Sequence, residues 1–326
     1  MFKKLILIII SICLVFSLSC SKKENKPNIK LPDNPNMNFP YSFVDSAGNE
    51  LTLYEEPKNV AVLSSSFAEI WTLAGGTVNI SVTKAKERGA ADSNCIIVDT
   101  QSNNMSIDTE LLISSEPDLV IGSSDHENQI DAVRLCRKAG IPSAIFNIKS
   151  FTDYLNVLKI STDLLNRPSN FKKYGTDIEE KIKSLLEVTD ELGSTTNILF
   201  LRIESSTHSL RAETKNESFV CTMLDELGTY NIAADIPSIF YNITAEEMIT
   251  KDPEIIFIAV TGDEAAAKEY LNSLFESEPY SSLTAVKQGN CHFLPDDLFG
   301  YEPNEEWYDA YLYLAKIIYP NTDLEA

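Results

Sequence analysis

The sequence is poor in several residues and patterns on which common kinds of site depend. Three histidines in 326 residues argue against a histidine-rich site for a bare transition metal. Lysine and arginine number 27 against 48 aspartates and glutamates, and the resulting net charge of −21 disfavours nucleic acid and anionic lipid head groups. No GxSxG nucleophile elbow appears. These absences weigh against DNA binding and α/β-hydrolase chemistry.

Long apolar runs are also scarce, because only Leu5–Leu18 forms one. Its 14 residues fall short of the roughly 18 that a membrane-spanning helix needs. Lys3 and Lys4 precede the run, and Ser19 with Cys20 follows it. This order of charge, apolar stretch and small residue predicts a secretory signal peptide over residues 1–19.

Cys20 is predicted to become the acylated first residue of a lipoprotein. Ser17 stands where the common pattern has leucine three places before the cysteine, and Leu18 follows it. Acyl chains would hold the protein at a membrane surface, because burial of each methylene group contributes about 0.8 kcal/mol. Residues 20–40 are polar and proline-rich, so they predict a solvated tether.

Four cysteines follow Cys20 without close spacing such as CxxC: Cys95, Cys136, Cys221 and Cys291. Export permits disulfides between them, in any of three connectivities. Free thiols on core faces are the other interpretation, and the sequence leaves both open.

The remaining part of the chain alternates short β-branched strands with amphipathic helices, which predicts α/β architecture with parallel sheets. Its length suits two lobes better than one core. The predicted strands are Val60–Leu63, Ile80–Val82, Ile96–Val98, Leu119–Ile121 and Ala144–Phe146, then Ile198–Ile203, Ile255–Val260 and His292–Leu294. We therefore expect two Rossmann-like lobes, over residues 41–166 and 194–326.

A single long helix is predicted to join the lobes over residues 167–193. Pro168 stands at a suitable first turn, and Gly193 follows the last periodic residue, Leu192. At 1.5 Å per residue this helix would be about 37 Å long. A strut of this kind should restrict hinge motion between the lobes.

One short unit occurs twice at the same spacing. In Ser106–Gly122 and again in Asn242–Ile258, a glutamate lies seven residues before a proline, which is followed by an acid and an apolar strand. The glutamates are Glu110 and Glu246. A first-turn acid is often only a helix-dipole partner, but a matching pair, one per lobe, suits docking to a two-fold partner with arginine pockets.

The chain from Phe43 to Pro320 resembles the binding proteins of ABC importers for ferric siderophores, haem and cobalamin. The resemblance rests on the Val44–Leu53 and Pro57–Leu63 segments, on both glutamate–proline units, and on Leu294–Phe299, Trp307 and Leu314–Pro320. It implies two lobes joined by a long helix, a ligand in the cleft between them, and Glu110 and Glu246 meeting arginines of the permease dimer.

The resemblance also implies a function. We expect a lipid-anchored, exported, monomeric protein that is not an enzyme, carries no cofactor of its own, and passes an iron chelate to a permease dimer with its ATPase. A ferric siderophore is favoured as the ligand, followed by haem and a corrinoid.

Ligands of parallel α/β lobes bind beyond the carboxyl ends of strands. This rule selects the loops Ser64–Phe67, Gly122–His126, Glu204–Arg211, Thr261–Asp263 and Asp296–Tyr301. Bulky, often anionic chelates suit arginines and aromatic rings. The candidate ligand-binding residues are Arg88, Arg211, Ser65, Ser124, Trp71, Tyr241 and Tyr301.

Three alternatives remain. His126, His208 and His292 with nearby carboxylates could bind Zn²⁺ or Mn²⁺ if both lobes contributed. A surface lipoprotein on the same fold could lack transport activity. The run Ser123–His126 resembles hydrolase residues, but neighbours on one loop rarely form a triad.

Overall fold

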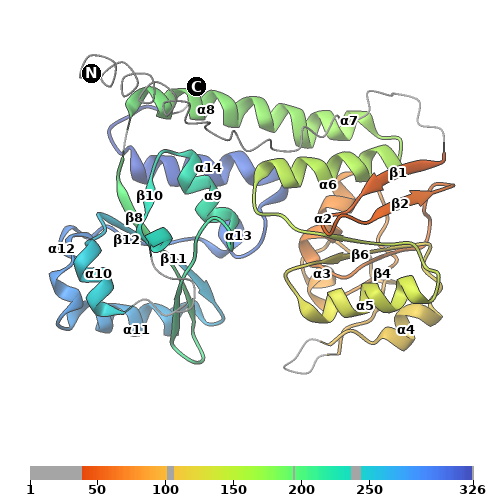
Figure 1. Cartoon of the computed structure of the whole chain (residues 1–326), viewed down its shortest axis with the longest axis horizontal. Coiled ribbons are helices and arrows are strands. Elements are labelled where there is room, and N and C mark those ends of the chain that lie inside the picture. The colour runs from red at the N-terminus through yellow and green to blue at the C-terminus, as the bar shows by residue number, and fades with distance from the viewer. Residues whose placement is uncertain (1–38, 101–105, 194, 236–243, 325–326) are drawn as a thin grey trace, which may run out of the picture. The chain divides into compact units, whose positions relative to one another are not determined.

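The computed structural model describes residues 39–100, 106–193, 195–235 and 244–324. The predicted signal peptide and Cys20 lie outside these residues. Figure 1 shows two sheets, each accompanied by helices, and long helical segments that connect them. Among the described helices, none combines the length and apolarity that crossing a membrane requires.

The first lobe begins with a hairpin and continues into a five-stranded sheet. The hairpin strands are β1 (Tyr41–Val44) and β2 (Glu50–Leu53), and the sheet strands are β3 (Val60–Val62), β4 (Ile80–Ser81), β5 (Ile96–Ile97), β6 (Leu119–Ser123) and β7 (Ser143–Phe146). The sheet is parallel in the order β5-β4-β3-β6-β7. This order reverses between β3 and β6, where ligand crevices form in open α/β sheets.

Alternation along β3 explains how helices cover both faces of this sheet. Val60 and Val62 join a core with helices α2 (Ser65–Leu73) and α6 (Phe151–Leu164), whereas Ala61 and Leu63 face a separate core. That second core includes residues of α4 (Thr109–Ser114) and α5 (Glu127–Lys138), and the short α3 (Thr83–Glu87) lies beside α2.

The connecting helical run follows the expected punctuation but is not uniform. It comprises α7 (Pro168–Phe171), a π-helical turn (Lys172–Thr176) and α8 (Asp177–Leu192). Pro168 occupies the first turn, and Gly193 ends α8 with φ of 63°, a left-handed conformation that glycine adopts at little cost. In the π turn, the Tyr154 hydroxyl donates a hydrogen bond of 2.9 Å to the Tyr174 carbonyl, which satisfies a group at an irregular turn.

The second lobe has a mixed sheet rather than a wholly parallel one. Its strands are β8 (Asn197–Glu204), β9 (Ser209–Ala212), β10 (Tyr230–Asn231), β11 (Ile255–Thr261) and β12 (Cys291–Phe293), in the order β10-β8-β11-β12 with β9 antiparallel to β8. Its helices are α9 (Phe219–Glu226), α10 (Ala245–Lys251), α11 (Glu264–Glu276), α12 (Thr284–Gln288), α13 (Asp296–Phe299) and α14 (Trp307–Ile318). The segment expected as a loop over Glu204–Arg211 is thus partly strand, because the chain turns back after β8 and forms β9, which pairs with β8 as a hairpin.

One apolar core runs through both lobes. It holds Val62 of β3, Tyr154 of α6, Leu185 of α8, Phe200 of β8 and Trp307 of α14. In Figure 1, α8 runs alongside α14 and continues through α7 toward α6. The predicted α/β fold of two lobes is confirmed, and the core makes them one packed body.

Candidate functional site

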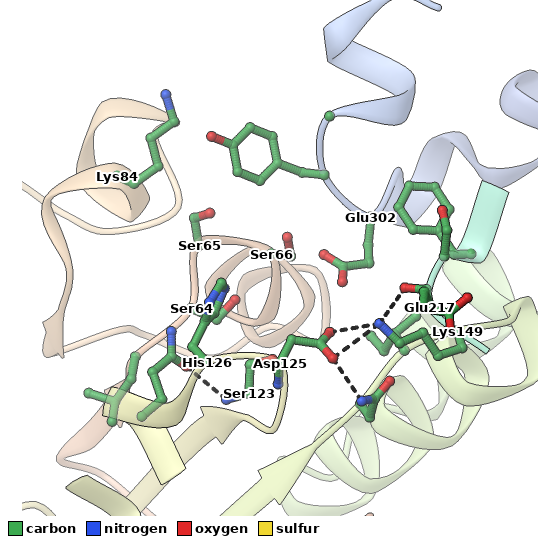
Figure 2. Close-up of a pocket in the computed structure, with 18 of the residues that line it drawn as sticks. Ser64, Ser65, Ser66, Lys84, Ser123, Asp125, His126, Lys149, Glu217 and Glu302 are labelled. Atoms are coloured by element: carbon green, nitrogen blue, oxygen red, sulfur yellow. Dashed lines mark hydrogen bonds and ion pairs between the residues drawn. The ribbon is translucent and has the colours of Figure 1, made fainter. Parts of the chain in front are cut away.

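A cleft of about 780 Å³ opens where strands of both lobes end, and residues of both lobes line it. From the first lobe come Ser64–Ser66 after β3, Asp125 and His126 after β6, and Asn147–Lys149 after β7; from the second come Arg202, Arg211, Glu213, Asn216–Phe219 and Gly300–Glu302. The β3 and β6 loops flank the reversal point of the first sheet. Figure 2 shows Ser65, Ser66 and Glu302 pointing into the same open space.

Lys149 connects the two lobes across this cleft. Its Nζ lies 3.1 Å from the Asp125 carboxylate and donates a hydrogen bond of 2.9 Å to the Glu217 carbonyl of the second lobe. The Asn147 amide donates to the same Asp125 carboxylate at 3.0 Å. The ammonium thus neutralises one acid of the cleft and bonds to the facing lobe.

Replacing Lys149 with methionine should increase local opening of the second lobe's segment around Glu217, because its bond to the Glu217 carbonyl is lost. The Lys149 side chain is 28% exposed, so loss of this partly screened hydrogen bond should cost about 1 kcal/mol and raise the local opening constant about fivefold. Hydrogen–deuterium exchange at residues 216–219 measures it. The exposed Lys172, paired with Asp177, provides the control Lys172→Met, and equal exchange in both variants would rule out the interlobe bond.

Two arginines of the cleft share one buried acid. Arg202 Nε donates to Glu213 Oε1 at 2.9 Å, and Arg211 donates to the same oxygen. Glu213 is 2% exposed. Burial alone would raise the pKa of its carboxyl group, but the two guanidinium groups outweigh burial and hold that pKa below its ordinary value. Arg211 therefore lines the cleft as predicted, but in a pair that is already satisfied.

Arg88 does not itself line the cleft, although it contacts a residue that does. Its guanidinium is bonded to the Glu69 carboxylate at 2.5 and 3.0 Å. The same guanidinium lies 4.5 Å from the ring centroid of Tyr301, which does line the cleft. Asn304 of the second lobe donates to Glu69 at 2.7 Å. Arg88 thus belongs to an interlobe contact that supports Tyr301.

The remaining predicted ligand residues have different positions. Ser65 lines the cleft. Trp71 does not, because its side chain is 1% exposed in the core and its Nε1 donates to the Thr77 carbonyl at 3.2 Å. Ser124 is also not among the lining residues, and its hydroxyl accepts a bond from Asn147. Tyr241 lies outside the described residues.

The paired glutamates sit in equivalent first turns. Glu110 is exposed in α4, whose N-cap Asp108 accepts from the Leu111 N–H at 2.9 Å, and Glu246 is exposed in α10. The neighbouring Glu247 completes a capping box with Thr244. Glu247 is therefore engaged in its own helix, while Glu110 and Glu246 face solvent.

Histidines and cysteines are scattered. Only His126 of the three lines the cleft; His208 stacks on Tyr270 at 4.2 Å, and His292 lies on β12. Within the described residues, no group of three His, Cys, Asp or Glu side chains is placed to hold a metal ion. The four described cysteines are free thiols.

Several lining residues escaped the sequence reasoning, among them Asn147, Lys149, Glu213, Glu217 and Glu302. Asn147 and Lys149 directly follow β7, so their place after a strand end is the sequence signal that indicates them. The acids gave no local signal, because their importance depends on which cations pack beside them.

Comparison with known proteins agrees with this arrangement. A family model described as periplasmic binding protein matches residues 60–298. A relative is the uncharacterized ABC transporter substrate-binding lipoprotein YvrC of Bacillus subtilis strain 168. The two sequences are 25% identical over 293 residues, which cover 87% of this chain and 87% of YvrC.

Two solved structures show the same fold. The haem-binding protein RhuT of Roseiflexus sp. RS-1 has a TM-score of 0.63 at 19% identity, over 81% of this chain and 98% of its own. The vitamin B12 binding protein BtuF of Vibrio cholerae has a TM-score of 0.66 at 16% identity, over 81% and 97%. This chain belongs to the periplasmic binding protein family, and the proteins it resembles include an ABC transporter substrate-binding lipoprotein and proteins named for binding haem and vitamin B12.

Proposed function

We propose that the protein captures a ferric siderophore in the interlobe cleft and delivers it to an ABC permease dimer with its ATPase. The observation that carries this proposal is the cleft itself, about 780 Å³ in volume and lined by hydroxyl, amide and charged groups of both lobes. This volume suits an organic chelate rather than a bare ion. The relatives named for haem and vitamin B12 support the same class of cargo, with haem and a corrinoid next in order.

The bare-metal alternative gains no support from the described residues, since the three histidines lie apart. Cys20 is the proposed acylation site, in keeping with a relative named as a lipoprotein. The anchored protein would work at the outer face of the cytoplasmic membrane or in the periplasm.

A fluorescence titration of the purified protein tests the cargo. The ligands are ferric hydroxamate and catecholate chelates, haemin, cobalamin, Zn²⁺ and Mn²⁺. The expected result is saturable quenching by a ferric siderophore at sub-micromolar concentration. Tight binding of a bare metal alone, or no binding of any ligand, would refute the proposal.

Glu110 and Glu246 are proposed to dock with arginines of the permease. The double variant Glu110→Ala/Glu246→Ala should reduce stimulation of permease ATPase activity in nanodiscs by at least tenfold, since each lost charge-assisted bond costs about 1.5–3 kcal/mol. Ligand affinity should not change, because neither residue lines the cleft.

The matched control is Glu247→Gln, which removes a neighbouring charge while glutamine can keep the capping box. It should stimulate like the wild type. Full stimulation by the double variant would instead favour docking elsewhere, or a surface lipoprotein without a transport role.

A further inference from the structure

We propose that the cleft selects a chelate that carries a positively charged group, with the Glu302 carboxylate as its recognition site. The inference rests on the proposed function and names the charge class of its ligand. It reverses the expectation from sequence, in which arginines would meet an anionic chelate.

The cations of the cleft are already engaged. Arg202 and Arg211 share Glu213, and Lys149 is paired with Asp125. Lys84 is the most loosely held, 3.7 Å from the exposed Glu87 and 5.7 Å from the Tyr301 ring centroid. An anionic ligand would therefore compete with existing carboxylates for nearly every positive charge.

The acids of the cleft are less completely paired. Among the described lining residues, five carboxylates face four lysines and arginines. Asp99 accepts bonds from Thr83, and Glu217 accepts bonds from Thr214, which are neutral donors. Glu302 is half-buried, and within the described residues it has no hydrogen bond or ion pair. A partly desolvated carboxylate of this kind is stabilised by an ammonium group from outside.

Two neutral polar groups of the cleft residues also lack hydrogen-bond partners among the described residues. The Ser218 hydroxyl, in a residue 3% exposed, and the Asn147 Oδ1 are buried without a hydrogen-bond partner in the described residues. The Asn147 amide nitrogen donates to the Asp125 carboxylate, which only accepts, so this contact fixes the orientation of the amide. Its oxygen is therefore an acceptor without a donor among the described residues of the cleft wall.

The whole molecule favours the same sign of ligand. Its net charge of −21 attracts cations and repels anions during encounter, and this effect weakens as salt is added. The Glu302 carboxylate, which lacks a partner among the described residues, and the acidic surface both point to a cationic chelate.

A matched pair of ligands tests the inference. The first is a linear ferric trihydroxamate with a free terminal ammonium, and the second is its N-acetylated, neutral form. Wild-type protein should bind the ammonium form about tenfold more tightly at low salt, as one charge-assisted bond allows. Glu302→Gln should abolish this difference, because it weakens binding of the ammonium form about tenfold relative to the acetylated form.

The control is Glu305→Gln, an exposed acid three residues along that does not line the cleft. It should preserve the difference. Thermal melting checks that Glu302→Gln folds normally, as expected for a side chain that makes no hydrogen bond or ion pair to the described residues.

Equal binding of the two trihydroxamates by wild type, or equal weakening of both by Glu302→Gln, overturns the inference while the transport class stands. Binding of an anionic ferric catecholate or haemin in preference to both trihydroxamates would also overturn the inference and leave the transport class standing. Failure of every chelate to bind would instead refute the proposed function, and the inference with it.

Discussion

Replacing Trp307 with alanine is expected to lower the free energy of unfolding by about 3–5 kcal/mol. The ring is fully buried and packs against Phe151, Tyr154, Phe219 and Tyr311, with centroid distances of 5.7, 6.1, 5.6 and 6.3 Å. Phe151 and Tyr154 belong to α6, whereas Phe219 belongs to α9 of the second lobe. Alanine would leave a cavity where the lobes join, measurable by urea unfolding.

Trp307→Phe is the control. Within the described residues the indole Nε1 makes no hydrogen bond, so phenylalanine removes volume but no polar contact. It should cost clearly less than alanine. An unchanged unfolding midpoint for Trp307→Ala would mean that this ring does not hold the lobes together.

Glu213→Gln should be the second most damaging change, at about 2–3 kcal/mol. The substitution leaves the guanidinium groups of Arg202 and Arg211 without their shared carboxylate. The cost stays below that of a wholly buried pair because the Arg211 side chain is 48% exposed and partly screened by water. Urea unfolding at neutral pH measures the loss.

The same carboxylate predicts a pH dependence. Its pKa is lowered in the folded state, so the unfolded chain binds the proton more readily. The stability from this pair is complete above the unfolded pKa of about 4.3 and disappears as pH falls through the folded value. Glu213→Gln should lack this part of the acid transition.

An exposed acid provides the comparison. Glu87, with a side chain 60% exposed and 3.7 Å from Lys84, should contribute little when changed to glutamine. If Glu87→Gln and Glu213→Gln shifted the unfolding midpoint equally, the buried arginine pair would not be the source of the effect.

The fold was largely predictable because its signals are local. Strand runs such as Val60–Leu63 and Ile198–Ile203, and the helix punctuation at Pro168 and Gly193, appear in the structure within a residue or two. The strand β9 was missed because its short, half-exposed residues lack a strong apolar pattern. Its pairing with β8 comes from the hairpin rather than from propensity.

The site was less predictable because its chemistry depends on partners brought together by folding. The strand-end rule found Ser65, Arg211 and Tyr301, all of which line the cleft. It could not show that Arg88 is bonded to Glu69, nor that Glu302 has no partner among the described residues. Trp71 satisfied an aromatic criterion but lies on the buried face of α2. Pairing of charges, rather than their presence, decides which residues are available to a ligand.

The position of the last helix has a consequence for how the protein is made. Helix α14 contributes Trp307, Leu314 and Ile318 to the same core as Val60 of the first sheet. That core cannot close until α14 has been synthesised, because this helix supplies part of its apolar side chains. Completion of the first lobe therefore waits for a helix of the second, so the two lobes should finish folding together rather than one after the other.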